Sequence, residues 1–317
     1  MGTRPRVAVI GGGISGMTAA HVLAGGSGRL RPEVLLVEAA GQLGGKVRTV
    51  PFVDLPVDTG PDAFLTRAPA LRALIETLGL TDAVVGPAVS GAFVLSRGRL
   101  RHLPPGTVFG VPQRLWPLLR SGLLSPTGVL RAGLDLVLPS RPLPKDPTVR
   151  ELLAPRFGDQ VYHRLIEPLL GGVHAGRAHL LSARSTVPEI EAVARANRSV
   201  YLGLRRGRSA RPAPGSAGPV LASIDGGLGR LVEALAATLP AGAARTGTSL
   251  TGLERTATGY RLTLAPTSGA TGRAEVVEVD AVVLATPAPA TAGLIRRLVP
   301  AAAAALDEIR HAGVCTV

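Results

Sequence analysis

The chain has little cysteine, little lysine and few aromatic residues. Cys315 is the one cysteine among 317 residues, so no internal disulfide and no cysteine-based metal site can form, and the chain suits a reducing cytoplasm. The six histidines show no spacing typical of a zinc site, and we expect no bound metal. No apolar run reaches the roughly 18 residues that a membrane-spanning helix needs, so we expect none.

Almost all of the positive charge comes from arginine. The formal net charge is +13, but Lys46 and Lys145 are the only lysines. Aromatic residues make up 3% of the chain, too few for the basic, aromatic-rich surface typical of nucleic-acid binding. We therefore expect no nucleic-acid partner, but a basic surface suited to a carboxylated substrate or to anionic lipid. Residues 116–138 are amphipathic, which leaves a peripheral contact with the inner membrane face open beside a cytoplasmic location.

Apolar runs typical of buried parallel strands stand at both ends of the chain. Three are wholly apolar: VAVI at 7–10, VLLV at 34–37 and AVVL at 281–284. Three segments that precede the last of these runs alternate as antiparallel strands do: 249–253, 259–265 and 275–279. The middle of the chain predicts short helices broken by prolines. We predict an α/β chain, α+β overall, in which a discontinuous Rossmann-like FAD-binding domain (residues 1–90 and 217–317) is interrupted by a mainly helical substrate domain (residues 91–216).

The first glycine cluster, GGGISG at residues 11–16, has the context of a dinucleotide-binding loop. It follows a predicted strand and opens a predicted helix. Gly11 permits a tight turn, Gly13 lets a pyrophosphate approach the backbone, and Gly16 lets the helix pack closely against the sheet. Glu38 ends the next strand, near the ~20-residue separation expected for an acid that accepts hydrogen bonds from ribose.

A second glycine cluster follows Glu38 in GQLGGKVRT, residues 41–49. Gly44 and Gly45 can bring the backbone close to the same dinucleotide, and Lys46 or Arg48 can neutralise its phosphates. This glycine–cation element resembles the extended signature of FAD-binding flavoenzymes, which favours FAD over NAD as the cofactor.

The glycines of EPLLGGVHAG, residues 167–176, have a different context. No buried strand precedes them and no ribose-binding acid follows them, so they do not form a phosphate loop. We predict a helix over residues 159–170, capped by Asp159 and ended by these glycines. The bare backbone of the glycines would then lie against a substrate.

Longer stretches resemble known families. IGGGISGMTAAHVL and VLLVEAAGQLGGKVRT resemble the FAD-binding amine-oxidase-like superfamily. Residues 58–67 (DTGPDAFLTR), 147–190 and 224–236 (IDGGLGRLVEALA) resemble its protoporphyrinogen and coproporphyrinogen oxidases. The resemblance implies an FAD-dependent oxidoreductase of haem synthesis. It would oxidise a porphyrinogen by hydride transfer to FAD, with oxygen as acceptor and hydrogen peroxide as product. The composition looks actinobacterial, which favours coproporphyrinogen III over protoporphyrinogen IX.

The resemblance also gives roles to single residues. It implies that Gly60 lies near the flavin ring, that the backbone of Leu250 meets the adenine, and that Thr286 lies at a strand end beside FAD. Gly172 is expected to place its main-chain carbonyl near the reacting macrocycle. His174 stands where the family commonly has Tyr or Phe, and these last two are the candidate catalytic residues.

Four arginines are candidate partners of substrate carboxylates. Arg177 stands where the family usually has an acidic or polar residue, and a cation there suits a more carboxylated substrate. The others flank the SRGRLRHLP turn: Arg97, Arg99 and Arg101. A solvated basic hairpin explains these three equally well.

Alternative functions stay open. One is another enzyme of the superfamily, an amine oxidase or a carotenoid desaturase, and another is a non-catalytic remnant that binds a nucleotide or a partner. Members of the resembled family extend well beyond this length and supply a further glycine-rich segment against the flavin. We therefore expect the chain to be truncated, with weak or no catalysis in isolation.

Overall fold

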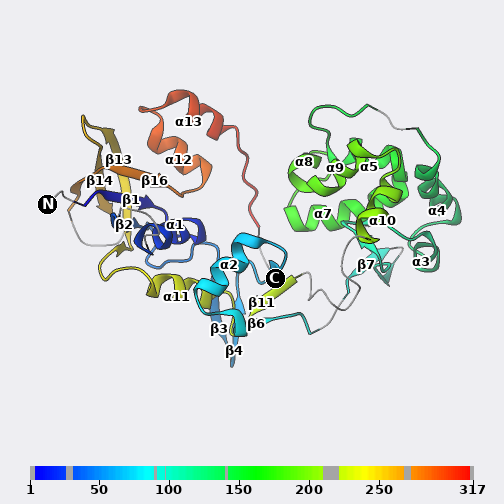
Figure 1. Ribbon diagram of the computed structural model, residues 1–317, viewed down its shortest axis with the longest axis horizontal. Helices are drawn as coiled ribbons and strands as arrows, with labels where there is room; N and C mark the ends of the chain where they lie inside the picture. The colour runs from blue at the N-terminus through cyan, green and yellow to red at the C-terminus, as the bar shows by residue number, and fades with distance from the viewer. Residues whose placement is uncertain are drawn as a thin grey trace. The chain divides into compact units, whose positions relative to one another are not determined.

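The structure is a computed structural model, and it describes residues 4–25, 31–88, 91–96, 98–139, 142–209, 221–267 and 273–314. The chain divides into two units (Figure 1). Unit 1 comprises Met1–Pro87 and Gly218–His311, unit 2 comprises Ala88–Ala217, and the last six residues are divided between them. These boundaries lie close to those expected at residues 90 and 216. Residues 210–220, which contain the second boundary, lie outside the described residues.

Unit 1 is built on a four-stranded parallel sheet. Its strand order is β12 (Ala244–Arg245), β2 (Glu33–Val37), β1 (Arg6–Ile10) and β16 (Ala281–Leu284). In the centre, β1 aligns Val7 with both Val34 and Ala281. Ala8 and Val9 are fully buried, as the uninterrupted apolar run predicts for a strand covered on both faces.

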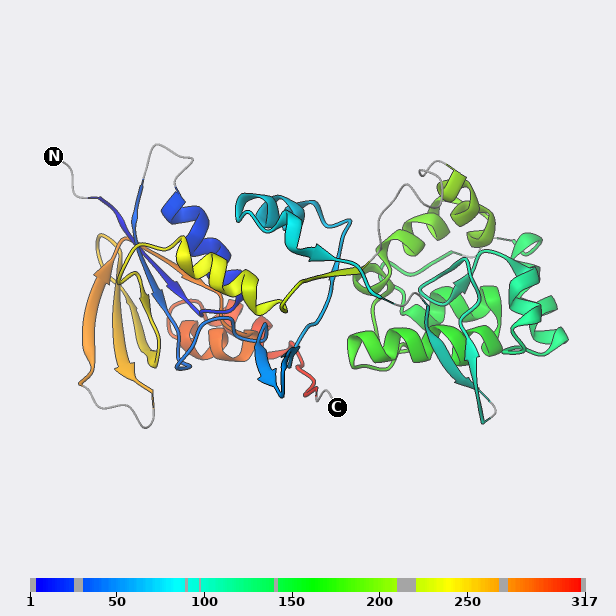
Figure 2. The same cartoon turned by 90° about the horizontal axis from the view of Figure 1, so that it is seen from below.

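Successive side chains of the sheet enter different cores because strand residues alternate between faces. Val9 and Leu36 pack against α1 (Ile14–Gly25), α2 (Pro69–Thr77) and α11 (Gly229–Ala237). Ala8 and Leu35 pack against an antiparallel sheet, whose strands are β13 (Thr248–Arg255), β14 (Tyr260–Pro266) and β15 (Glu275–Val279). The three layers are visible in Figure 2, and the predicted parallel and antiparallel strands are confirmed.

Smaller elements surround this core. Strands β3 (Thr49–Phe52) and β4 (Leu55–Asp58) form a hairpin, and a short sheet has the order β5 (Phe64–Leu65), β11 (Leu221–Ile224), β6 (Val84–Val85). Helices α12 (Ala288–Ile295) and α13 (Pro300–Asp307) follow β16. An ion pair between Arg296 and Asp307, 2.8 Å long, joins the ends of these two helices.

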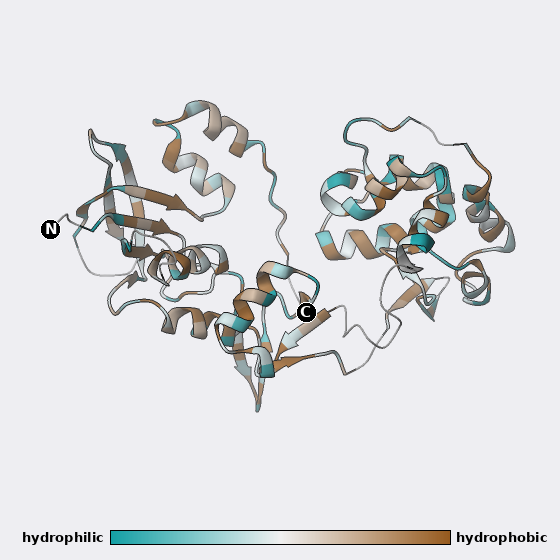
Figure 3. Ribbon diagram, in the orientation of Figure 1, coloured by the Kyte–Doolittle hydropathy of each residue, from teal (hydrophilic) through white to brown (hydrophobic). Residues whose placement is uncertain are grey.

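Unit 2 is mainly helical, and its helices carry both hydrophobic and hydrophilic stretches (Figure 3). Two hairpins come first: β7 (Phe93–Ser96) with β8 (Arg99–His102), and β9 (Thr107–Val108) with β10 (Val111–Pro112). Besides α6 and α7, described below, the helices are α3 (Leu115–Arg120), α4 (Pro126–Gly133), α5 (Val149–Phe157), α8 (Ala183–Thr186), α9 (Pro188–Ala196) and α10 (Val200–Ser209). Within the described residues, no helix is both long and apolar enough to cross a bilayer.

The helix expected over residues 159–170 differs in both its start and its end. Gly158, not Asp159, occupies the cap position, and α6 (Asp159–Val161) leads through a π-helical turn, η3 (Tyr162–Ile166), into α7 (Glu167–His174). Pro168 cannot donate a backbone hydrogen bond, and a π-helical turn is one way to absorb such an interruption. The helix therefore continues through Gly171 and Gly172, and the left-handed residue Ala175 (φ 46°) ends it.

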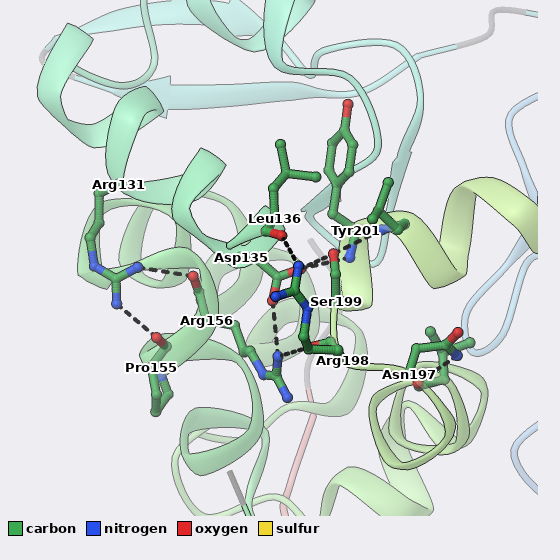
Figure 4. Close-up of polar contacts among 11 residues, drawn as sticks. Arg131, Asp135, Leu136, Pro155, Arg156, Asn197, Arg198, Ser199 and Tyr201 are labelled. Atoms are coloured by element: carbon green, nitrogen blue, oxygen red, sulfur yellow. Dashed lines mark hydrogen bonds and ion pairs between the residues drawn. The ribbon is translucent and has the colours of Figure 1, made fainter. Parts of the chain in front are cut away.

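A buried ion pair that the sequence did not suggest connects separate elements of unit 2 (Figure 4). Asp135 is fully buried, and its Oδ1 lies 3.2 Å from a guanidinium nitrogen of Arg156. Its Oδ2 accepts hydrogen bonds from the Ser199 hydroxyl (2.9 Å) and the Tyr201 N–H (2.8 Å). Arg156 also donates to the carbonyl of Arg198. Each buried charge thus has partners, which is the condition for tolerating it.

Candidate functional site

A pocket of about 680 Å³ opens at the carboxyl ends of β1, β2 and β16. Ligands of open α/β sheets bind at this edge, where the loops that follow the strands meet. Eight of the ten residues expected to contact the cofactor line this pocket: Gly11, Gly13, Glu38, Gly44, Gly45, Lys46, Leu250 and Thr286. Glu38 and Thr286 are far apart in the sequence, yet both line the pocket because parallel strands end at a common edge of the sheet.

The first glycine loop is shaped by close packing on one side and by open space on the other. Gly11 has φ +108°, and a Cβ on it would lie 2.8 Å from the carbonyl oxygen of Ala285. A Cβ on Gly16 would collide with the carbonyl oxygen of Gly11, so Gly16 does not line the pocket but lets α1 pack against the loop. A Cβ on Gly13 would meet nothing within 4 Å. The pocket is therefore open to a ligand at Gly13, beside the N-terminus of α1.

Glu38 is tied to the same loop. Its Oε2 accepts a hydrogen bond from the Gly12 N–H at 2.5 Å, and its Oε1 accepts one from the Ala40 N–H at 2.7 Å. Each carboxylate oxygen has a second lone pair, so the side chain can still accept hydrogen bonds from ribose hydroxyls.

The second glycine cluster joins the first to form one wall. The Gly44 N–H donates to the Gly12 carbonyl at 2.8 Å, and a Cβ on Gly45 would lie 3.0 Å from the Cα of Gly13. Lys46 is exposed at the rim. Gly60 lies behind this segment, because a Cβ on it would collide with the carbonyl oxygen of Lys46.

Sequence reasoning missed several residues of the pocket region. Gly12 lies too close to Glu38 for a side chain, since its Cβ would come within 2.8 Å of the Glu38 Cβ. The triple glycine was the available signal. Ser15, Thr248 and Ser249 line the pocket, but no local pattern distinguishes them from other hydroxyl residues.

Comparisons with known proteins agree with this geometry. A family model described as "Flavin containing amine oxidoreductase" matches residues 14–317. This chain belongs to that family. The chain is 36% identical over 313 residues to the coproporphyrinogen III oxidase of Mycobacterium leprae (strain TN), covering 98% of this chain and 65% of that protein. It is 33% identical over 304 residues to the coproporphyrinogen III oxidase of Bacillus subtilis (strain 168), covering 93% and 62%.

A solved structure shows the same relationship. The crystal structure of an Exiguobacterium sp. 255-15 protein, described as "Putative protoporphyrinogen oxidase", matches with a TM-score of 0.76 at 31% identity. The match covers 94% of this chain and 62% of that chain. The chain thus spans less than two thirds of the length of these relatives. The α/β class with a parallel sheet is confirmed, and so is FAD as the cofactor of the family.

The pocket fits a flavin dinucleotide, and we call it the flavin pocket. The open space at Gly13 admits a pyrophosphate, the free lone pairs of Glu38 suit ribose, and Lys46 supplies a cation at the rim. A larger groove of about 740 Å³ in unit 2 fits less well. Its lining charges have both signs, and two of them, Arg150 and Asp159, lie 3.5 Å apart.

The candidate substrate residues lie in unit 2. Gly172 and His174 are exposed in the last turn of α7, where the final carbonyl groups have no partner within the helix. The expectation of a bare glycine loop was wrong, but a free carbonyl at Gly172 is compatible with the helix end. Arg177 is exposed just beyond it.

The arginines of the β7–β8 hairpin differ from one another. Arg99 is exposed. Arg101 is partly buried and donates to the Ser121 carbonyl at 3.2 Å, while its Nε is buried without a hydrogen-bond partner among the described residues. Arg97 lies outside the described residues. The side chains of Arg99 and Arg101 therefore have different surroundings, although they stand two residues apart.

Two histidines near α7 contact the same carboxylate. Nδ1 of His163 lies 2.8 Å from Glu167 Oε2, and Nδ1 of His179 lies 3.8 Å from Glu167 Oε1. In the part of the chain that the structure describes, no group of three or more acidic, histidine or cysteine side chains is arranged to hold a metal.

Proposed function

We propose that the protein oxidises a porphyrinogen to the porphyrin in haem synthesis, with coproporphyrinogen III as the preferred substrate. The relatives named above as coproporphyrinogen III oxidases support the reaction. FAD, when bound, would supply the hydride acceptor for repeated two-electron oxidation of the macrocycle, with oxygen as the final electron acceptor and hydrogen peroxide as the product.

The distribution of charge is the observation that carries the choice of substrate. Residues 88–217 contain 19 Lys and Arg against 7 Asp and Glu, whereas the rest of the chain contains 16 against 15. Unit 2 therefore holds +12 of the net charge of +13. A basic unit attracts a substrate that carries several carboxylates, and coproporphyrinogen III carries more of them than protoporphyrinogen IX.

In unit 1, the proposed work of the residues is to bind and orient the cofactor. The N-terminus of α1 and the backbone at Gly13 bind the pyrophosphate, and Lys46 neutralises it. Glu38 accepts hydrogen bonds from ribose. Leu250 and Thr286 line the same pocket, which supports their proposed positions beside the adenine and beside FAD at the strand end.

In unit 2, the proposed work is to hold the macrocycle. The carbonyl of Gly172 lies near the reacting carbon, and His174 and Arg177 follow it in the chain. Arg177, Arg99 and Arg101 bind carboxylates as cations. Arg97 belongs to the same proposed set.

Anaerobic reduction of the bound flavin tests this proposal. Coproporphyrinogen III should bleach the flavin absorbance faster than protoporphyrinogen IX, and admitting oxygen should restore the absorbance with release of hydrogen peroxide. Bleaching by neither porphyrinogen, in a protein of the relatives' full length that binds FAD, would overturn the proposal. Bleaching by a polyamine instead would indicate an amine oxidase.

A further inference from the structure

The glycine cluster DGGLG, residues 225–229, does not line the flavin pocket, although it opens helix α11 as a phosphate loop would. The β3–β4 hairpin occupies its N-terminal N–H groups instead. The Leu228 N–H lies 3.1 Å from both carboxylate oxygens of Asp58, and the Gly229 N–H donates to the Thr49 hydroxyl at 2.7 Å. The negative side chain also complements the positive end of the helix dipole.

Thr49 and Asp58 act together at this helix end. They face each other across the hairpin, and the Thr49 hydroxyl donates to Asp58 Oδ1 while accepting from Gly229. Gly227 has φ +94°, and a Cβ on it would lie 2.5 Å from Thr49 Cγ2. The fit leaves no room for a side chain between hairpin and helix.

Two contacts connect this arrangement to the flavin pocket. On the helix side, a Cβ on Gly44 would lie 3.1 Å from Val232 of α11. On the hairpin side, the residues that follow β4 contact those that precede β3. The Thr59 N–H donates to the Arg48 carbonyl at 2.9 Å, and Gly60 packs against the Lys46 carbonyl. Residues 44–46 therefore lie between α11 and the hairpin.

We propose that Thr49 and Asp58 are positioning residues for the flavin pocket: by holding the N-terminus of α11 against the hairpin, they fix residues 44–46 at the pocket rim. This inference rests on the proposed assignment of Gly44, Gly45 and Lys46 to the cofactor. It gives the hydroxyl and the carboxylate a role in cofactor affinity without any contact with the cofactor.

Affinity for FAD is the first test, measured by titrating the purified 317-residue chain with FAD. Thr49→Val keeps the shape but loses the hydroxyl, and Asp58→Ala loses the carboxylate; each should raise Kd about tenfold. Thr49→Ser retains the hydroxyl and should restore the wild-type Kd. Asp54→Ala, at the exposed tip of the same hairpin, is the matched control and should leave Kd unchanged.

Amide hydrogen exchange in the FAD-free protein is the second test. Thr49→Val and Asp58→Ala should speed exchange at Leu228 and Gly229, and also at Gly44, whose N–H is hydrogen-bonded in the pocket wall. Faster exchange at the helix end alone, with an unchanged Kd, would show that the pair only caps α11 and would overturn the inference.

The two tests separate this inference from the proposed function. If the wild-type chain binds no FAD, the proposed function fails. Hydrogen exchange at Gly44 in the Thr49 and Asp58 variants then decides by itself whether the hairpin positions residues 44–46. If Asp58→Ala does not fold, FAD titration and hydrogen exchange are compared between Thr49→Val and Thr49→Ser instead.

Discussion

Glu38 and Gly12 are joined by a 2.5 Å hydrogen bond from the glycine N–H to the carboxylate. The two residues are 26 positions apart, and a Cβ on Gly12 would lie 2.8 Å from the Glu38 Cβ. The acid that ends β2 and the loop that follows β1 therefore form one structural unit. A ribose contact made by Glu38 depends on the loop that orients its carboxylate.

Replacing Glu38 with Gln should weaken FAD binding about tenfold, roughly 1.4 kcal/mol. The two Glu38 carboxylate oxygens accept from the N–H groups of Gly12 and Ala40. In glutamine, an NH2 group replaces one of these oxygens and would face a backbone N–H, so one hydrogen bond would be lost. The other would lose the negative charge that strengthens it. FAD titration measures the effect. Glu33→Gln, at the other end of β2 in an exposed pair with Arg6, should change Kd little, and equal effects at both positions would contradict the assignment.

Gly13→Ala should lower FAD affinity, whereas Gly16→Ala should lower folding stability. Gly13→Ala adds a methyl group to open space, so the FAD-free protein should keep its stability while FAD affinity falls at least about tenfold, because the methyl group occupies ligand space. Gly16→Ala forces a methyl group into the Gly11 carbonyl and should cost about 1–3 kcal/mol of folding stability. Thermal unfolding without FAD and FAD titration separate the two. Equal loss of stability in both variants would show that Gly13 has no open side.

The sequence predicted the parts of the fold that local patterns specify. Apolar runs predicted β1, β2 and β16, because a strand buried on both faces needs no polar alternation. The end of α7 was mispredicted because glycine usually weakens a helix, whereas here the buried Leu170 anchors the helix and the left-handed Ala175 ends it beyond Gly172. Tertiary packing decided this outcome.

In the candidate site, too, the sequence predicted the residues that follow a local pattern and missed the contacts between distant residues. The glycine loops and Glu38 were predicted because the cofactor requires them at fixed spacing. The pairing of Thr49 and Asp58 with α11 depends on residues 170 or more positions away, and no spacing rule connects them. Asp135 and Arg156 likewise lie on separate elements, so only the folded chain shows that they pair.

Asp135→Asn should destabilise unit 2 by about 3–5 kcal/mol, because it leaves the buried Arg156 cation without its counter-charge. Trp116 is the only tryptophan and lies in α3, so its fluorescence during chemical denaturation reports on this unit. The double variant Asp135→Asn/Arg156→Met should lose less than the two single losses added. Asp159→Asn, in the exposed pair with Arg150, should cost at most about 1 kcal/mol. Additive losses in the cycle would contradict the coupling.

Tyr162→Phe should stabilise unit 2, and most strongly at alkaline pH. The Tyr162 side chain is fully buried, and its hydroxyl has no hydrogen-bond partner among the described residues. Burial raises the pKa of this hydroxyl, the Glu167 carboxylate raises it further, and the Arg150 guanidinium opposes them. Because the pKa is higher in the folded than in the unfolded chain, stability is retained below about pH 10 and falls as the pH rises beyond it.

Phenylalanine removes both the unpaired hydroxyl and its ionisation. We expect a gain of roughly 1 kcal/mol at neutral pH and a flatter loss of stability above about pH 10, both measured from Trp116 fluorescence in denaturant. Tyr260→Phe, in β14 of unit 1, is the control and should leave the Trp116 transition unchanged. A loss of stability in Tyr162→Phe at neutral pH would mean that the hydroxyl makes a favourable contact, and the alkaline effect would then need another cause.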